Sequence, residues 1–63
     1  MDYRVFNATD GVYASPDVFD TAGAEEFCSQ FRRKFKMIQG YYKTADGERI
    51  DPADVKLVLE AKP

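Results

Sequence analysis

The sequence has no histidine and no tryptophan, and Cys28 is its only cysteine. These absences exclude a disulfide framework within the chain, a zinc site of the Cys/His type and every catalytic triad that uses histidine. Without histidine, a general base near neutral pH would have to be a deeply buried carboxylate or lysine with a strongly shifted pKa. A chain of 63 residues offers few such sites. We therefore expect no enzymatic activity, no catalytic residues and no cofactor, with Cys28 filling a small space in the core.

Long apolar runs and a strong charge of one sign are also missing. The longest apolar run is three residues, Leu57 to Leu59, whereas a bilayer-spanning helix needs about 20. Nine Lys and Arg against eleven Asp and Glu give a formal charge of −2. That balance does not by itself indicate nucleic-acid binding or attraction to a membrane. Because the first residues lead into a strand-like pattern rather than an apolar signal core, the sequence predicts one cytoplasmic domain covering residues 1–63, without membrane contact.

One amphipathic helix is predicted from about Ala22 to Gln39. Asp20 and Thr21 before it are favourable N-cap residues, and Gly40 after it can end a helix in the left-handed conformation. At about 100° per residue the apolar side chains of this segment form one continuous stripe. The stripe consists of Ala24, Phe27, Cys28, Phe31, Phe35 and Ile38. Such a helix must lie on another apolar surface.

Strand-like segments precede and follow this helix. They span residues 3–8, 12–14, 41–44, 48–50 and 55–60, the 48–50 segment being very short. Turns are indicated at Asp10-Gly11 and Asp46-Gly47, and the cap and proline of Asp51 to Asp54 indicate one short helical turn. The predicted order is β-β-α-β-β. This is an α+β fold in which one amphipathic helix packs on a small, mostly antiparallel sheet.

Four acidic residues near the C-terminal turns raise the question of a calcium site: Asp46, Glu48, Asp51 and Asp54. A calcium-binding helix–loop–helix needs oxygen ligands at its first, third, fifth and twelfth positions and glycine at the sixth. If Gly47 is that glycine, Tyr42 and Ala53 fall where the first and last carboxylates belong. The acids are better explained by turn and capping roles, and no metal site is predicted.

A basic run, Arg32 to Lys36, has two interpretations. Together with Lys43 it could form an anion-binding patch for phosphates or nucleic acid, made of Arg32, Arg33, Lys36 and Lys43. Alternatively, the cations complement the negative end of the helix dipole, as Glu25 and Glu26 complement its start. The sequence leaves both interpretations open.

One helix can cover only one face of the sheet, so the other face is the candidate interaction surface. Strand alternation places on it Arg4, Phe6, Tyr41, Lys43, Lys56 and Val58. Such an aromatic-apolar patch beside cations is unusual on a small monomer. Three hypotheses account for it: self-association through this face or an edge strand, docking to another protein, or stacking of nucleotide bases on Phe6 and Tyr41 with cations on the phosphates.

These observations favour a non-catalytic binding or regulatory module that acts through protein–protein contacts and forms a homo-oligomer. The alternative is a module that binds nucleotides or nucleic acid through the basic and aromatic surface.

The C-terminal block GYYKTADGERIDPADVKLVLE, Gly40 to Glu60, resembles a stretch found in short uncharacterised bacterial proteins. There a Tyr-Tyr strand leads into a glycine turn, an Arg-Ile pair, a proline and a final alternating strand. The resemblance implies a shared small α+β module and no activity. In size the chain is also similar to stand-alone phage or mobile-element proteins, which act as inhibitors or sponges by binding a host factor or a signalling nucleotide.

Overall fold

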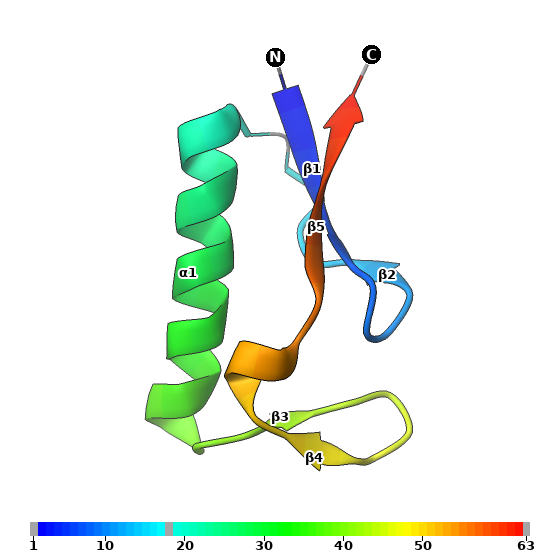
Figure 1. The fold of residues 1–63 in the computed structure, drawn as a ribbon, viewed down its shortest axis with the longest axis vertical. Helices are drawn as coiled ribbons and strands as arrows, with labels where there is room; N and C mark the ends of the chain where they lie inside the picture. The colour runs from blue at the N-terminus through cyan, green and yellow to red at the C-terminus, as the bar shows by residue number, and fades with distance from the viewer. Residues whose placement is uncertain (1, 18, 63) are drawn as a thin grey trace.

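The computed structural model describes residues 2–17 and 19–62 and confirms the β-β-α-β-β order of a small α+β fold (Figure 1). In chain order the elements are β1 (Asp2–Asn7), β2 (Val12–Tyr13), α1 (Thr21–Ile38), β3 (Tyr42–Lys43), β4 (Arg49–Ile50), the 3-10 turn η1 (Pro52–Asp54) and β5 (Leu57–Lys62). The first and last strands lie side by side along α1, and both chain ends lie at the same end of the molecule.

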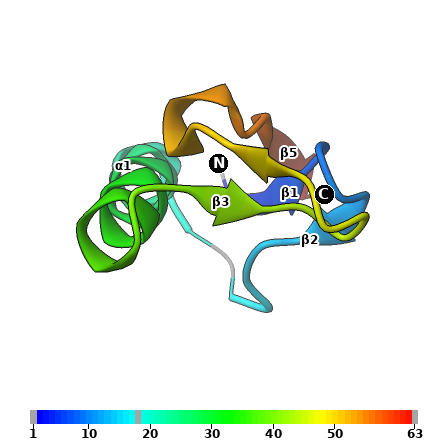
Figure 2. The same ribbon diagram turned by 90° about the horizontal axis from the view of Figure 1, so that it is seen from below.

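The strands form two antiparallel sheets instead of the one expected. One sheet has the order β2-β1-β5, and the other is the β3–β4 hairpin. Figure 2 shows this hairpin crossing the end of the molecule beyond the larger sheet. The sequence pattern predicts this hairpin, with its turn at Asp46-Gly47, but it does not predict that the hairpin is separate from the larger sheet. The edge of β1 opposite β2 is taken by β5 along its whole length. The surface expected to combine β1, β3 and β5 is therefore divided.

The helix has the caps expected for it. The Asp20 side chain accepts a hydrogen bond from the Gly23 backbone N–H at 2.7 Å. Past the C-terminal end, Gly40 adopts φ +80°, and its N–H donates to the Phe35 carbonyl at 3.0 Å. A left-handed residue at this place is strained for any side chain but glycine, so the helix ends where the glycine stands.

The core lies between one face of α1 and the inner face of the larger sheet. Val5, Ala24 and Cys28 are its buried centre. Around them pack Tyr3, Ala14, Phe19, Phe27, Leu57 and Leu59. The alternation predicted for the first and last strands is therefore correct on its inner side. Burial raises the pKa of the Cys28 thiol, which disfavours its thiolate form.

The predicted apolar stripe is wrong at its end, because Ile38 is 68% exposed. The last turn of α1 extends past the end of the larger sheet, as Figure 1 shows. Further up the helix, Phe31 and Phe35 contact Tyr42 of the small hairpin with ring centroids 5.9 and 5.0 Å apart. The lower half of the helix thus packs on an aromatic residue of β3 rather than on β1.

A hydrogen-bond network joins the two sheets at Tyr42. The buried Asn7 amide donates to the Tyr42 hydroxyl at 2.9 Å, and that hydroxyl donates to the Asp10 carboxylate. Asp10 also accepts from the Ala45 backbone N–H at 2.9 Å. These donors lower the pKa of Asp10, with the Tyr42 hydroxyl as the larger cause. Residues 35 positions apart in the chain are therefore fixed to each other by one buried tyrosine.

Candidate functional site

The outer face of the larger sheet, away from α1, carries a cluster of interacting side chains. We define the outer-face cluster as Arg4, Phe6, Tyr13, Val58 and Glu60. The strand register places Arg4 opposite Glu60, and Phe6 between Val58 and Tyr13. Phe6 and Tyr13 meet edge to face at 5.2 Å, and the Arg4 guanidinium lies 5.6 Å from the centre of the Tyr13 ring. Val58 and Tyr13 are still 48% and 46% exposed, so the cluster is a partly apolar surface open to a partner.

Tyr13 holds the cluster together across the sheet. Its hydroxyl donates to the Glu60 carboxylate at 2.6 Å, and this hydrogen bond raises the pKa of the Tyr13 hydroxyl. The sequence pattern predicted a short returning strand here but did not assign Tyr13 to the surface. The signal that could have found it is the tight turn before it, since the pairing of Asn7 with Val12 places Tyr13 opposite Phe6.

The structure brings together only part of the predicted interaction surface. Arg4, Phe6 and Val58 are neighbours on the outer face. Lys56 is exposed just before β5, and its carbonyl accepts from the Ala8 N–H at 2.8 Å, which extends the ladder by one pair. Tyr41 and Lys43 are at the β3–β4 hairpin instead, where the Arg49 guanidinium covers the Tyr41 ring at 4.6 Å. The two rings expected to form one base-stacking surface are therefore in different parts of the fold: Phe6 belongs to β1, whereas Tyr41 directly precedes β3.

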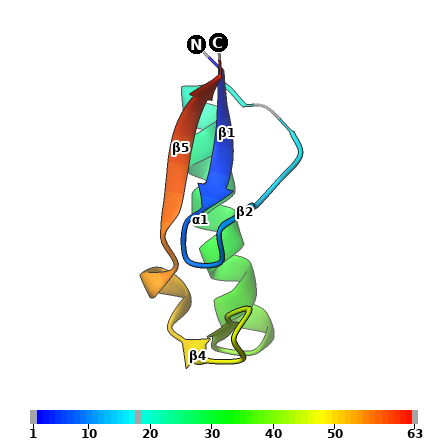
Figure 3. The same cartoon turned by 90° about the vertical axis from the view of Figure 1, so that its right-hand side faces the viewer.

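Strand β5 lies at the border of the larger sheet, as Figure 3 shows. Within residues 2–17 and 19–62, only β1 pairs with it. Its six residues expose roughly 20 Å of backbone edge. Unpaired N–H and C=O groups on such an edge are a template for another strand.

The direction of the β5 hydrogen bonds follows from those of β1. The Tyr3 backbone bonds to that of Phe19, and the Val5 carbonyl accepts from the Ala14 N–H. The backbone N–H and C=O groups of the odd-numbered residues of β1 therefore point away from β5. The even-numbered residues point toward β5, as the bond from Ala8 to Lys56 shows. In an antiparallel ladder the groups of consecutive residues alternate in direction. The outward-pointing backbone groups of β5 therefore belong to Leu57, Leu59 and Ala61.

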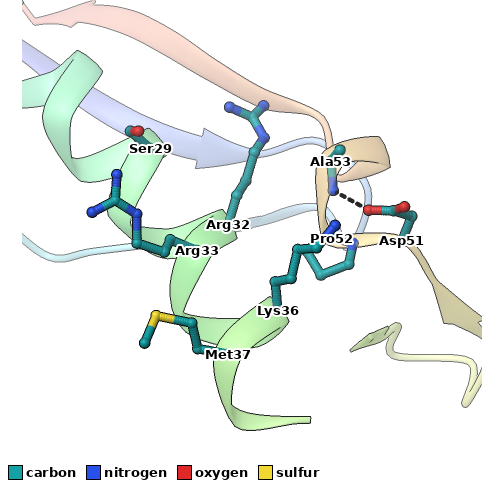
Figure 4. Close-up of a pocket in the computed structure, with 8 residues that line it drawn as sticks. All are labelled: Ser29, Arg32, Arg33, Lys36, Met37, Asp51, Pro52 and Ala53. Carbon is teal, nitrogen blue, oxygen red and sulfur yellow. Dashed lines mark hydrogen bonds between the residues drawn. The ribbon is translucent and has the colours of Figure 1, made fainter. Parts of the chain in front are cut away.

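A second candidate site is a basic groove of about 490 Å³ between α1 and η1 (Figure 4). Its lining residues are Ser29, Arg32, Arg33, Lys36, Met37, Asp51, Pro52 and Ala53. Three of the four residues predicted to bind anions lie here, within about one turn of α1: Arg32, Arg33 and Lys36. The fourth, Lys43, is outside the groove.

Arg32 makes a structural contact in addition to lining the groove. It is half-buried, and its guanidinium donates to the Val55 carbonyl at 3.0 Å, which fixes the approach to β5 against the helix. Its Nε atom is buried and has no hydrogen-bond partner among the described residues. Arg33 and Lys36 are exposed. The carboxylate of Asp51 accepts from the Ala53 N–H at 2.9 Å, as expected for a cap.

In the part of the chain that the structure describes, no three His, Cys, Asp or Glu residues come close enough together to hold a metal ion. Across that same part, no helix has both the length and the apolar character needed to cross a membrane.

Comparison with protein-family models, curated proteins and solved structures found no match to this chain. The resemblance of the Gly40 to Glu60 block to short bacterial proteins therefore stays an expectation.

Proposed function

We propose that this protein is a non-catalytic binding module that acts through protein–protein contact and associates with itself through the larger sheet. The observation that carries the proposal is the outer edge of β5, which no strand among the described residues covers and which adjoins the half-exposed Val58 of the outer-face cluster. An edge strand next to an apolar surface is the usual place for strand addition.

The small size of the domain supports self-association. A chain of 63 residues buries only about 60% of the surface that its unfolded form exposes. Adding a strand to β5 would satisfy backbone groups that otherwise bond only to water, and it would cover apolar surface of the outer-face cluster. Small domains often gain stability in this way, by oligomerisation.

The proposal predicts a mass above 7.2 kDa in sedimentation at micromolar concentration. Val58→Glu is expected to lower that mass, because it places a charge beside the β5 edge where a second copy would pack. Tyr41→Glu introduces the same charge next to β3, outside the larger sheet, and it serves as the control that leaves the mass unchanged. A wild-type protein that stays monomeric up to the highest soluble concentration would contradict the proposal.

A second candidate function rests on the basic groove. We propose that Arg32, Arg33 and Lys36 bind a phosphate-bearing ligand, such as a nucleotide or single-stranded nucleic acid. The supporting observation is that one groove collects three cations, one of which has a buried Nε atom without a partner among the described residues. Its described lining has no aromatic ring, so recognition there would be electrostatic rather than by base stacking.

The test of this second function is the salt dependence of binding to a short oligothymidylate. Three cation–phosphate contacts predict a loss of affinity of about 20-fold between 50 and 200 mM salt. Arg33→Glu is expected to abolish the binding, whereas Lys43→Glu changes the net charge equally from outside the groove and should have a smaller effect. The absence of measurable binding at 50 mM salt, to the oligonucleotide and to ATP, would eliminate this function.

A further inference from the structure

We infer that two copies of the chain pair their β5 strands antiparallel about a two-fold axis at Val58, with Lys56 of each copy opposite Glu60 of the other. This inference rests on the proposed self-association, and it adds the register, the symmetry and the residues that determine both.

The backbone of β5 limits the ways in which two copies can pair. Leu57, Leu59 and Ala61 direct their N–H and C=O groups to the free edge, so these residues must form the hydrogen-bonded pairs of the new ladder. Two identical antiparallel strands must also pair symmetrically about one residue. The two-fold axis can therefore lie at only a few residues along β5.

Charge distinguishes these positions. An axis at Val58 places Lys56 opposite Glu60 of the second copy, and it does so twice because of the symmetry. An axis at Leu59 places Glu60 opposite the apolar Val58, and an axis at Glu60 places two carboxylates opposite each other. Opposite charges directly across a ladder stabilise it and like charges destabilise it. Among these positions, only an axis at Val58 therefore pairs the two charged ends of the segment Lys56 to Glu60 with opposite charges.

An axis at Val58 also gives favourable side-chain contacts on both faces of β5. Leu57 and Leu59 of opposite copies become hydrogen-bonded neighbours on the inner face, where both side chains already pack against the core. Val58 meets its own copy on the outer face in a non-hydrogen-bonded pair, whose Cα atoms are about 4.5 Å apart and whose side chains touch. This contact covers an apolar side chain that is 48% exposed in the single chain.

The resulting assembly is one continuous sheet of six strands, in the order β2-β1-β5 followed by its symmetric copy, with both helices on the same face. Figure 3 shows that β5 forms the free border of the sheet and that α1 lies behind it rather than beside its edge. The pairing also removes the exposed edge that would otherwise allow open-ended aggregation.

Charge exchange between copies tests the register. Homodimers of Lys56→Glu, and likewise of Glu60→Lys, each contain two like-charge pairs, and their self-association is expected to weaken about tenfold or more. An equimolar mixture of the two variants contains only opposite-charge pairs across the axis, so heterodimers should exceed the homodimers several-fold. Native mass spectrometry with one variant isotope-labelled measures that ratio. The double variant K56E/E60K is expected to recover the wild-type association.

Two controls separate this effect from others. Glu60→Lys also removes the acceptor of the Tyr13 hydroxyl, so Tyr13→Phe tests the loss of that hydrogen bond alone. As a direct readout of the axis, Val58→Cys should form a disulfide-linked dimer under mild oxidation, because Cα atoms about 4.5 Å apart satisfy disulfide geometry. Glu60→Cys should not form one, since the two substituted positions would lie on opposite sides of the axis.

The outcomes of these experiments distinguish the proposed β5 register from the proposed self-association. A dimeric wild type whose charge variants show no preference for heterodimers, and whose Val58→Cys variant does not cross-link, would overturn the register while leaving self-association intact. A monomeric wild type would overturn both.

Discussion

Tyr42→Ala is expected to destabilise the domain by about 3–5 kcal/mol, the usual cost of removing a buried aromatic ring. Tyr42 is only 7% exposed and contacts the rings of Phe31 and Phe35. Its loss would leave a cavity beneath the lower half of α1 and leave the buried Asn7 amide without its acceptor. A domain of this size has a total stability of about 3–9 kcal/mol. Urea unfolding followed by circular dichroism should therefore show an unfolding transition at a much lower urea concentration than that of the wild type.

The conservative variant Tyr42→Phe separates the ring from its hydroxyl. It keeps the packing of the ring but leaves the Asn7 amide without its acceptor. The expected loss of stability is therefore smaller, about 1–3 kcal/mol. The hydroxyl is also the main cause of the lowered pKa of Asp10, so this variant should return that pKa toward its ordinary value of about 3.9.

The pH dependence of this contribution has a defined sign. A lowered pKa in the folded state means that the interaction stabilises the protein above the unfolded pKa and is lost as the pH falls through the folded value. The stability difference between wild type and Tyr42→Phe should therefore shrink below about pH 4. A constant difference from pH 7 to pH 2, with an unchanged Asp10 titration in NMR spectra, would show that the hydroxyl does not act through this carboxylate.

Val5→Asp is expected to cost about 3–5 kcal/mol, because it places a charge without a partner in the core. Val5 is fully buried and belongs to the centre of the core with Ala24 and Cys28. The carboxylate would have to remain charged among apolar atoms or take up a proton, and both options oppose folding. Loss of the helical signal in circular dichroism at neutral pH, with partial recovery at low pH, is the expected observation.

Val58→Asp is the matched control for this experiment. It makes the same substitution in the neighbouring strand but on the outer face, where Val58 is 48% exposed. A change of stability within about 1 kcal/mol is expected there, with the oligomeric state as the property that changes. If Val58→Asp unfolded the domain while Val5→Asp did not, the two faces of the larger sheet would be assigned the wrong way round.

The local features of the fold could be predicted from the sequence because their causes are local. The cap at Asp20 and the stop at Gly40 act within a few residues, so the helix bounds differ from the expected ones by a single residue. The alternation of Val5 and Val58 between faces also follows from the two-residue period of a strand. Each of these inferences needs only the chain segment in which it is made.

What the sequence did not predict depends on contacts between distant segments. The exposure of Ile38 depends on where the sheet ends, and the separation of Tyr41 from Phe6 depends on which strand takes the edge of β1. The contact of Arg32 with the Val55 carbonyl depends on the return of the chain through η1. The candidate site was therefore found in part. Arg4, Phe6 and Val58 were identified, whereas Tyr13 and its acceptor Glu60 required knowledge of the strand register.

The pairing of β1 with β5 has a consequence for how the protein folds. The central strand of the larger sheet comes first in the chain, and its full-length partner comes last. Closing so large a loop is entropically unfavourable before the contacts form, so a fold of this connectivity forms slowly for its size. A ribosome must also complete Leu57–Lys62 before the ladder can close. Until then the first hairpin and the helix lack most of their apolar cover, and the nascent chain depends on its charged residues to avoid association with other chains.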